Sequence, residues 1–145
     1  MTKLLLMLLA LLPGVADPGP TPYRAGQVWA YHTRPSDKGS LLKIQRVERL
    51  GDQVVYHLSI IGIHLRAPGF IGVLQHEPVS QASLDRSVTA LRPDPGTFPS
   101  ADDGIAEWRR AHGGVYTITI AETLEVLDRS LAKQAEDRAP APPTT

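Results

Sequence analysis

The stretch that decides the fold runs from Gln53 to Glu77 and reads QVVYHLSIIGIHLRAPGFIGVLQHE. Its first half, residues 53–65, is an apolar run with the alternation of a strand. The residues on one face of that strand are Val54, Tyr56, Leu58 and Ile60. A Pro-Gly turn signal at 66–69 separates it from a second apolar run at 70–76. Strands joined by so short a turn are antiparallel neighbours, because a parallel crossover needs a dozen residues or more.

Two further strands precede this hairpin. Residues 26–34 are rich in aromatic and β-branched side chains and end at the turn PSDKG, and residues 40–50 end at Gly51-Asp52. The whole stretch 26–77 is therefore predicted to be a four-stranded meander.

The periodicity changes after this meander. Leu84, Val88 and Leu91 have helical spacing, with Ser80 as the predicted cap and Pro93 as the stop. A second short helix is predicted from Ser100 or Asp102 to Gly113-Gly114, a fifth strand over VYTITI at 115–120, and a third helix over 121–138. The expected fold is α+β, in the order ββββααβα, with an antiparallel sheet of about five strands and three helices on one face.

The N-terminus has the three-part layout of a secretory signal. Lys3 precedes an apolar run from Leu4 to Leu12, and Gly14 and Ala16 supply small residues for cleavage. We expect a signal peptide at 1–16. The apolar run from Leu4 to Leu12 is far shorter than the roughly 20 residues of a membrane-spanning helix. The predicted mature chain has a Pro-rich leader at 17–25, one domain at 26–135 and a disordered tail at 136–145, with no membrane span.

The amino-acid composition bears on the compartment, the host and the partners that we expect. The chain contains no cysteine, which fits a bacterial exported protein, periplasmic or secreted, better than a eukaryotic one. It also lacks Asn, and beyond the signal it lacks Met. Either a thermophilic or oxidatively stressed host or a GC-rich genome would explain these absences. The charges balance, with 15 basic and 15 acidic residues, so nothing favours a nucleic-acid partner.

Four segments carry a resemblance: YRAGQVWAYHTRP at 23–35, VVYHLSI at 54–60, HEPVS at 76–80 and GGVYTITIAE at 113–122. Together they resemble a set of small exported bacterial proteins of uncharacterised function. The resemblance covers most of the mature chain and implies a single domain. Its motifs are turns and strands, so it implies no activity and no cofactor.

The histidines are the residues most suggestive of chemistry. His57 and His64 are seven apart and point to opposite faces of a regular strand. His57 is expected on the face opposite the helices. Its neighbour depends on the hairpin register: His76 if paired residue numbers sum to 133, Glu77 if they sum to 134, and neither if they sum to 137.

A catalytic or metal site is one alternative. His57, His76 and Glu77 could act as acid and base, and His32 could join His57 and His76 around a metal. No compact ligand spacing such as H-E-x-x-H supports this. The favoured expectation is that His57 and His76 are independent surface or semi-buried residues of the sheet and not ligands of one metal.

Binding is the other alternative. If Val28 and Ala30 are buried, Trp29 and Tyr31 are exposed together and mark a contact surface, beside His57 on the open sheet face. Trp108 is expected to be buried with Ile105, anchoring its helix. We therefore expect a non-enzymatic exported domain that binds a protein, a peptide or a small ligand, with a partner in the cell envelope, and a small hydrolase or metal binder as the alternative.

Overall fold

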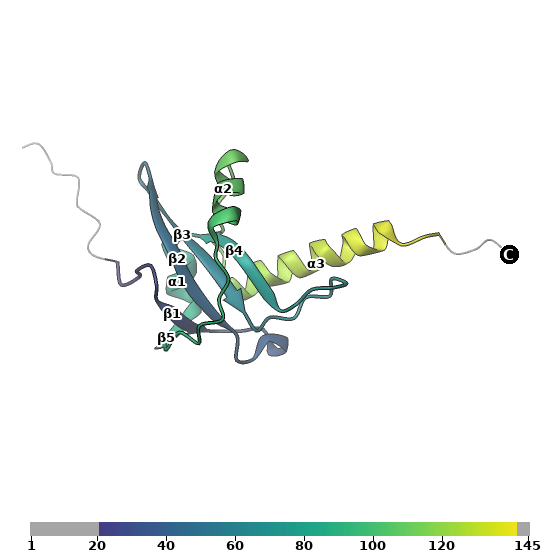
Figure 1. The fold of residues 1–145 in the computed structure, drawn as a ribbon, viewed down its shortest axis with the longest axis horizontal. Helices are drawn as coiled ribbons and strands as arrows, with labels where there is room; N and C mark the ends of the chain where they lie inside the picture. Colours follow the sequence, from purple (N-terminus) through teal and green to yellow (C-terminus); the bar gives the residue numbers. More distant parts are fainter. Residues whose placement is uncertain (1–20, 142–145) are drawn as a thin grey trace, which may run out of the picture.

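The computed structural model describes residues 21–141 (Figure 1). Its strands are β1 (Val28–Tyr31), β2 (Leu41–Leu50), β3 (Gln53–Ile61), β4 (Val73–Val79) and β5 (Val88–Arg92). Its helices are α1 (Gln81–Ser87), α2 (Asp102–Arg110) and α3 (Ile120–Arg138), with a 3₁₀ turn at Pro35–Asp37. This confirms the predicted fold class, a five-stranded antiparallel sheet with three helices in an α+β domain. The predicted signal peptide lies outside the described residues.

The sheet has the order β4-β3-β2-β1-β5, and all its neighbours are antiparallel. The first four strands are the predicted meander. The tight turn at Gly51-Asp52 joins β2 to β3, and Gly51 has a φ of 59°, which a residue without a Cβ adopts at least cost.

The fifth strand comes from a different segment than expected. The helical stripe predicted through Val88 and Leu91 stops at Ser87, and Val88–Arg92 pairs with the free edge of β1. Residues 115–119 are mostly extended loop, with one isolated bridge between Tyr116 and Val79. Thr119 and Glu122 form a capping box that starts α3 at Ile120, so the observed order is ββββαβαα.

The main core lies between the sheet and the helices α1 and α3. Tyr56, Leu58 and Ile60 face this core, as the alternation predicted, and all three are fully buried. The residues that meet them from the helices are Leu84, Ile120 and Leu124. Tyr23 also belongs to the core, so the packed domain begins inside the segment predicted to be a leader. The helix α3 continues to Arg138, three residues into the predicted tail.

The opposite face of the sheet is covered as well. Figure 1 shows α2 and the segment leading to it in front of the strands, with α1 and the start of α3 behind them. A second set of buried apolar residues lies outside the main core cluster and consists of Val28, Val55, Ala101 and Ile105. The expectation of helices on one face only is therefore wrong, and the face that carries His57 is not open.

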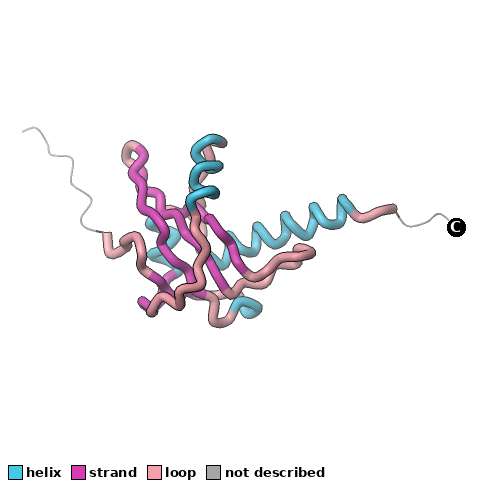
Figure 2. The backbone as a smooth tube through the Cα atoms, in the orientation of Figure 1, coloured by secondary structure: helices cyan, strands magenta, loops and turns pink. Residues whose placement is uncertain are grey.

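The second half of α3 extends past the sheet, as the backbone view in Figure 2 shows. Its buried residues all belong to its first half, from Ile120 to Asp128. Asp128 fixes the loop between β3 and β4 by accepting hydrogen bonds from the backbone and guanidinium of Arg66.

Candidate functional site

His57 and His76 meet beneath α2. His57 pairs across the sheet with Pro78, and Leu58 with Glu77, so paired numbers sum to 135 here. A bulge between Leu58 and Ile60 shifts the pairing farther along the hairpin. None of the three registers considered from the sequence holds at His57. His76 is nevertheless a diagonal neighbour of His57 on the same face, because it lies two residues before Pro78.

The two histidines belong to a chain of four polar side chains. His57 Nδ1 lies 2.8 Å from His76 Nε2, and His57 Nε2 lies 2.9 Å from Glu48 Oε2. Arg109 of α2 donates to the other oxygen, Glu48 Oε1, over 2.9 and 3.2 Å. We call Arg109, Glu48, His57 and His76 the histidine relay. The expectation that His57 and His76 are independent of each other is wrong, because the two rings share a hydrogen bond. His57 is fully buried and His76 is half-buried.

The protons in the relay follow from Glu48. Burial alone would raise the pKa of this carboxyl, but the hydrogen bonds from His57 and Arg109 outweigh it and lower the pKa. The ionised carboxylate only accepts, so His57 Nε2 donates to it. In a neutral imidazole the other nitrogen is then an acceptor, and His76 Nε2 donates to His57 Nδ1. This leaves His76 Nδ1 with the free lone pair.

Both imidazoles are held neutral. Burial lowers the pKa of His57 below its usual 6.5, against the opposing effect of Glu48. Burial and the neighbouring His57 lower the pKa of His76 to about 4. The relay at neutral pH therefore contains one anion, one cation and two uncharged rings.

The fit of α2 on these rings depends on two glycines. Gly104 lies directly over His76, and a Cβ at that position would overlap the imidazole. Trp108 contacts the His57 ring edge-on, with ring centroids 4.9 Å apart, and donates to the carbonyl of Gly114. Gly113 leaves room for the Trp108 ring, which a Cβ there would overlap.

The end of α2 places a strained residue beside the relay. Gly113 N bonds to the carbonyl of Trp108, and His112 N to that of Arg109, which is the Schellman pattern. The left-handed position in this motif usually holds Gly, but here it holds His112, with a φ of 49°. The predicted helix stop at Gly113-Gly114 is therefore one residue late.

A groove of about 400 Å³ lies between the tip of the β2–β3 hairpin and this end of α2. We call it the hairpin groove. Its walls are Glu48, Leu50, Trp108, Arg109, His112 and Gly113. Leu50 is 45% exposed, so an apolar side chain lines the groove next to a carboxylate and a guanidinium. The relay reaches the groove through Glu48 and Arg109, whereas its histidines lie beneath α2.

Glu77 does not join the relay. It pairs with Leu58 and points to the main-core face, where it is buried and its Oε1 has no hydrogen-bond partner. Burial raises its pKa to about 8, so it is protonated at neutral pH. The predicted acid–base set of His57, His76 and Glu77 is therefore split between two faces of the sheet.

The other predicted residues are also separated from the relay. His32 is exposed, and His64 is exposed beside the buried Asp37. Tyr31 is buried in the main core and shares a hydrogen bond with Ser40. Trp29 packs against the same core, so the expected exposed pair of aromatic residues is not found.

The relay is not arranged as a metal centre. Zinc–nitrogen bonds of about 2.0–2.1 Å in a tetrahedral site keep two nitrogens roughly 3.3 Å apart, whereas His57 Nδ1 and His76 Nε2 are at hydrogen-bond distance. Within residues 21–141, no three His, Asp or Glu side chains are grouped closely enough to hold a metal ion.

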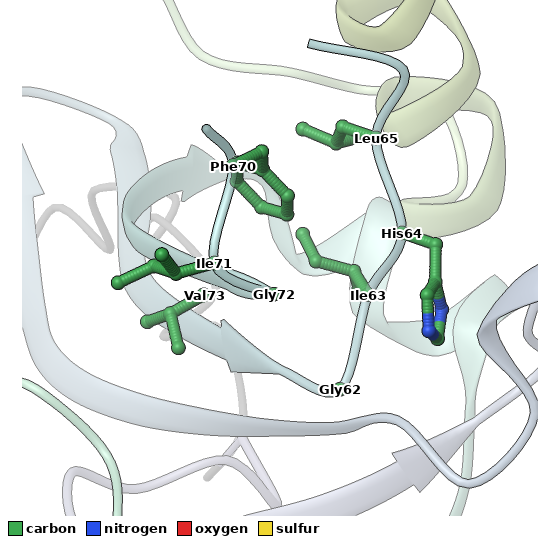
Figure 3. A pocket seen from close by; sticks show the side chains of 8 residues that line it. All are labelled: Gly62, Ile63, His64, Leu65, Phe70, Ile71, Gly72 and Val73. Atoms are coloured by element: carbon green, nitrogen blue, oxygen red, sulfur yellow. The ribbon is translucent and has the colours of Figure 1, made fainter. Parts of the chain in front are cut away.

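A second hollow, of about 490 Å³, lies in the loop between β3 and β4. Figure 3 shows Ile63, Leu65 and Phe70 turned toward one another there, and His64 turned away from them. Ile71 is 85% exposed at its rim. This apolar loop carries no group that suggests a reaction.

Two residues of the relay were not predicted. Arg109 gave no signal in the sequence. Glu48 had one, because a two-residue turn at Gly51-Asp52 pairs Glu48 with Val55 and so places it on the face of His57.

No helix among the described residues has both the length and the apolar character needed to cross a bilayer. Comparison of the chain with protein-family models, with curated proteins and with solved structures gives no match.

Proposed function

We propose that this chain is an exported, non-enzymatic binding domain that takes a peptide or small ligand in the hairpin groove. The observation that carries the proposal is the combination of Leu50, Trp108 and His112 at one groove. An exposed leucine and a half-buried tryptophan offer apolar contact, and Arg109, Glu48 and His112 offer polar groups at the rim. The ligand chemistry that fits is an apolar side chain flanked by hydrogen-bonding groups, as in an extended peptide.

The strain at His112 supports the same site. A left-handed non-glycine residue costs about 1 kcal/mol or more, and such residues cluster at functional sites. His112 places its imidazole at the rim of the hairpin groove, which a glycine in the same motif would leave bare.

Binding can be tested with a library of immobilised, extended hexapeptides. Peptides that capture the protein are then made in free form and titrated into a Trp29→Phe variant, in which Trp108 is the remaining tryptophan. We expect saturable changes in Trp108 fluorescence, and loss of at least tenfold in affinity in Leu50→Asp. Val126→Asp is the matched control, because Val126 is 50% exposed on α3 and lies outside the groove. Peptides that bind Leu50→Asp as tightly as the parent would refute the site.

Export is the second part of the proposal. It rests on the layout of residues 1–16 and predicts a mature N-terminus near Asp17 outside the cytoplasm. Mass analysis of the native N-terminus checks this expectation. Intact Met1 in the cytoplasmic fraction would contradict it.

A hydrolytic role is the second candidate, because the relay leaves a lone pair on His76 Nδ1 at the end of a chain that begins at a carboxylate. In nucleophilic hydrolases a histidine that is oriented by a further group acts as the general base, and His76 would be oriented through His57 in the same way. A rate of p-nitrophenyl acetate hydrolysis that falls at least tenfold in His76→Gln, but not in His64→Gln, would favour this candidate over binding alone.

A further inference from the structure

The helix α2 is attached to the sheet outside the main core cluster, through a few apolar and a few polar contacts. None of the residues of the main core cluster belongs to α2. Its apolar anchors are Ile105, which is buried, and Trp108, which is partly exposed. Its polar anchors are Arg109 on Glu48 and an exposed ion pair between Arg46 and Asp102.

Both ends of α2 join segments suited to act as hinges. The segment before it, PDPGTFPS at 93–100, has no regular secondary structure, and Gly113-Gly114 follows it. A movement of the helix would therefore not require a strand of the sheet to break, although Lys43 and Gln45 of β2 contact the preceding segment at Asp94 and Pro99.

We propose that α2 is a latch, which stays closed on this face of the sheet while His57 and His76 are neutral and opens when they take up protons. The closed latch keeps the hydrogen bond between His57 Nδ1 and His76 Nε2, which needs a donor on one ring and an acceptor on the other. When both rings are protonated, both facing nitrogens carry a hydrogen and the bond is lost. A protonated His76 would place a cation against the His57 ring.

The charged groups around the two rings do not compensate for two added positive charges. The groups that face the two rings are Arg46 and Glu48 from β2 and Arg109 from α2. Asp102 of α2 is paired with Arg46, and the nearby Glu107 is exposed and paired with Arg110. Glu48 is the carboxylate in direct contact with the His57 ring, and Arg109 already neutralises it. Two added protons would make the relay strongly cationic beneath α2.

The direction of the pH effect follows from linkage. The pKa of each histidine is lowered in the closed state, so closure is fully favoured above the unperturbed value of 6.5 and weakens as the pH falls toward about 4. A lowering of this size at His76 alone shifts the closed-to-open ratio on the order of a hundredfold. Opening removes Trp108, Arg109 and His112 from the hairpin groove. Opening would therefore release a bound ligand in acid, and this consequence rests on the proposed function. The latch itself does not rest on it.

The test is amide hydrogen exchange from pH 7 to pH 4. Protection factors are measured for residues 102–110 and for β3 in the same sample. The histidine rings are titrated by NMR over the same range. We expect protection in α2 to fall at least tenfold more than in β3, with a midpoint that follows the His57 and His76 resonances. His57→Gln with His76→Gln should abolish this difference. His76→Gln alone serves if the double variant does not fold, and His32→Gln is the control that should change nothing.

Two results would overturn the latch. One is loss of protection in α2 and β3 together, which means global acid unfolding. The other is an α2 transition that persists in His76→Gln. Absence of peptide binding at pH 7 would refute the hairpin groove and leave the latch untouched, so the two failures are distinguishable.

Discussion

The face of the sheet under α1 and α3 is closed by apolar side chains, whereas the face under α2 is closed by the histidine relay and a small apolar set. On the first face Leu42, Tyr56 and Leu58 are fully buried against the helices. On the second, a buried imidazole bonds to a second imidazole and to a carboxylate. Burial of each large apolar side chain contributes about 1.5–3 kcal/mol, whereas a net hydrogen bond contributes about 0.5–1.5 kcal/mol.

The difference assigns separate roles to the two faces. The α1/α3 face buries many more large apolar side chains than the α2 face, so it supplies most of the stability of the domain, and apolar burial is insensitive to pH. The α2 face depends on protonation states, so it supplies the response to pH. Glu77 is the exception on the first face, because it is a buried carboxyl without a partner for Oε1.

The largest expected effect is on the apolar face. Leu58→Ala should lower the free energy of unfolding by about 2–5 kcal/mol, by lost transfer energy and a residual cavity. The loss is measured by urea denaturation at pH 5, where Glu77, the cross-strand partner of Leu58, is protonated in the folded protein. A loss below about 1 kcal/mol would contradict the division between the faces.

Glu77→Gln tests the exception on that face. The folded-state pKa is raised from 4.5 to about 8, so the parent loses stability as the pH rises from 4.5 through 8. At about 1.4 kcal/mol per pH unit the loss approaches roughly 5 kcal/mol. The variant should remove most of this slope and be more stable than the parent at pH 8. Glu136→Gln, on the exposed end of α3, should leave the slope unchanged.

Trp108→Ala should cost about 1–3 kcal/mol. The sequence predicts a buried anchor, for which a loss of about 3–5 kcal/mol is typical, but the side chain is partly exposed, so less buried surface is lost. Thermal and urea unfolding measure the loss. A value above about 4 kcal/mol would mean that α2 is part of the main stabilising core and not a separately attached element.

The smallest effect is a gain. His112→Gly relieves the left-handed strain at the end of α2 and should stabilise the protein by about 0.5–1 kcal/mol. The same variant should weaken ligand binding if the imidazole is part of the groove. A loss of stability would show that His112 makes contacts worth more than its strain.

The meander could be predicted because its signals are local. PSDKG and Gly51-Asp52 mark turns, and the alternation of Val54, Tyr56 and Leu58 marks a buried face. The fifth strand could not be predicted in the same way. Residues 88–92 become a strand because β1 offers a free edge, while 115–119 alternates well but obtains only one bridge.

The relay was beyond prediction for a related reason. The bulge between Leu58 and Ile60 sets which residues lie beside His57, and no residue type announces it. Arg109 lies 61 positions from Glu48, its partner in the relay, and its placement depends on how α2 crosses the sheet. The partial burial of Trp29 likewise depends on Tyr23, which contacts it edge-on from the predicted leader.

A double-mutant cycle on His57 and His76 tests the central claim, that a coupled imidazole pair closes the α2 face. The variants are His57→Gln, His76→Gln and the double variant, and the free energy of unfolding is measured for each at pH 7. Residues that share a buried hydrogen bond couple, and we predict an interaction energy of about 1–2 kcal/mol. Additivity within about 0.5 kcal/mol would contradict the account, because it would mean that the two histidines act as separate residues.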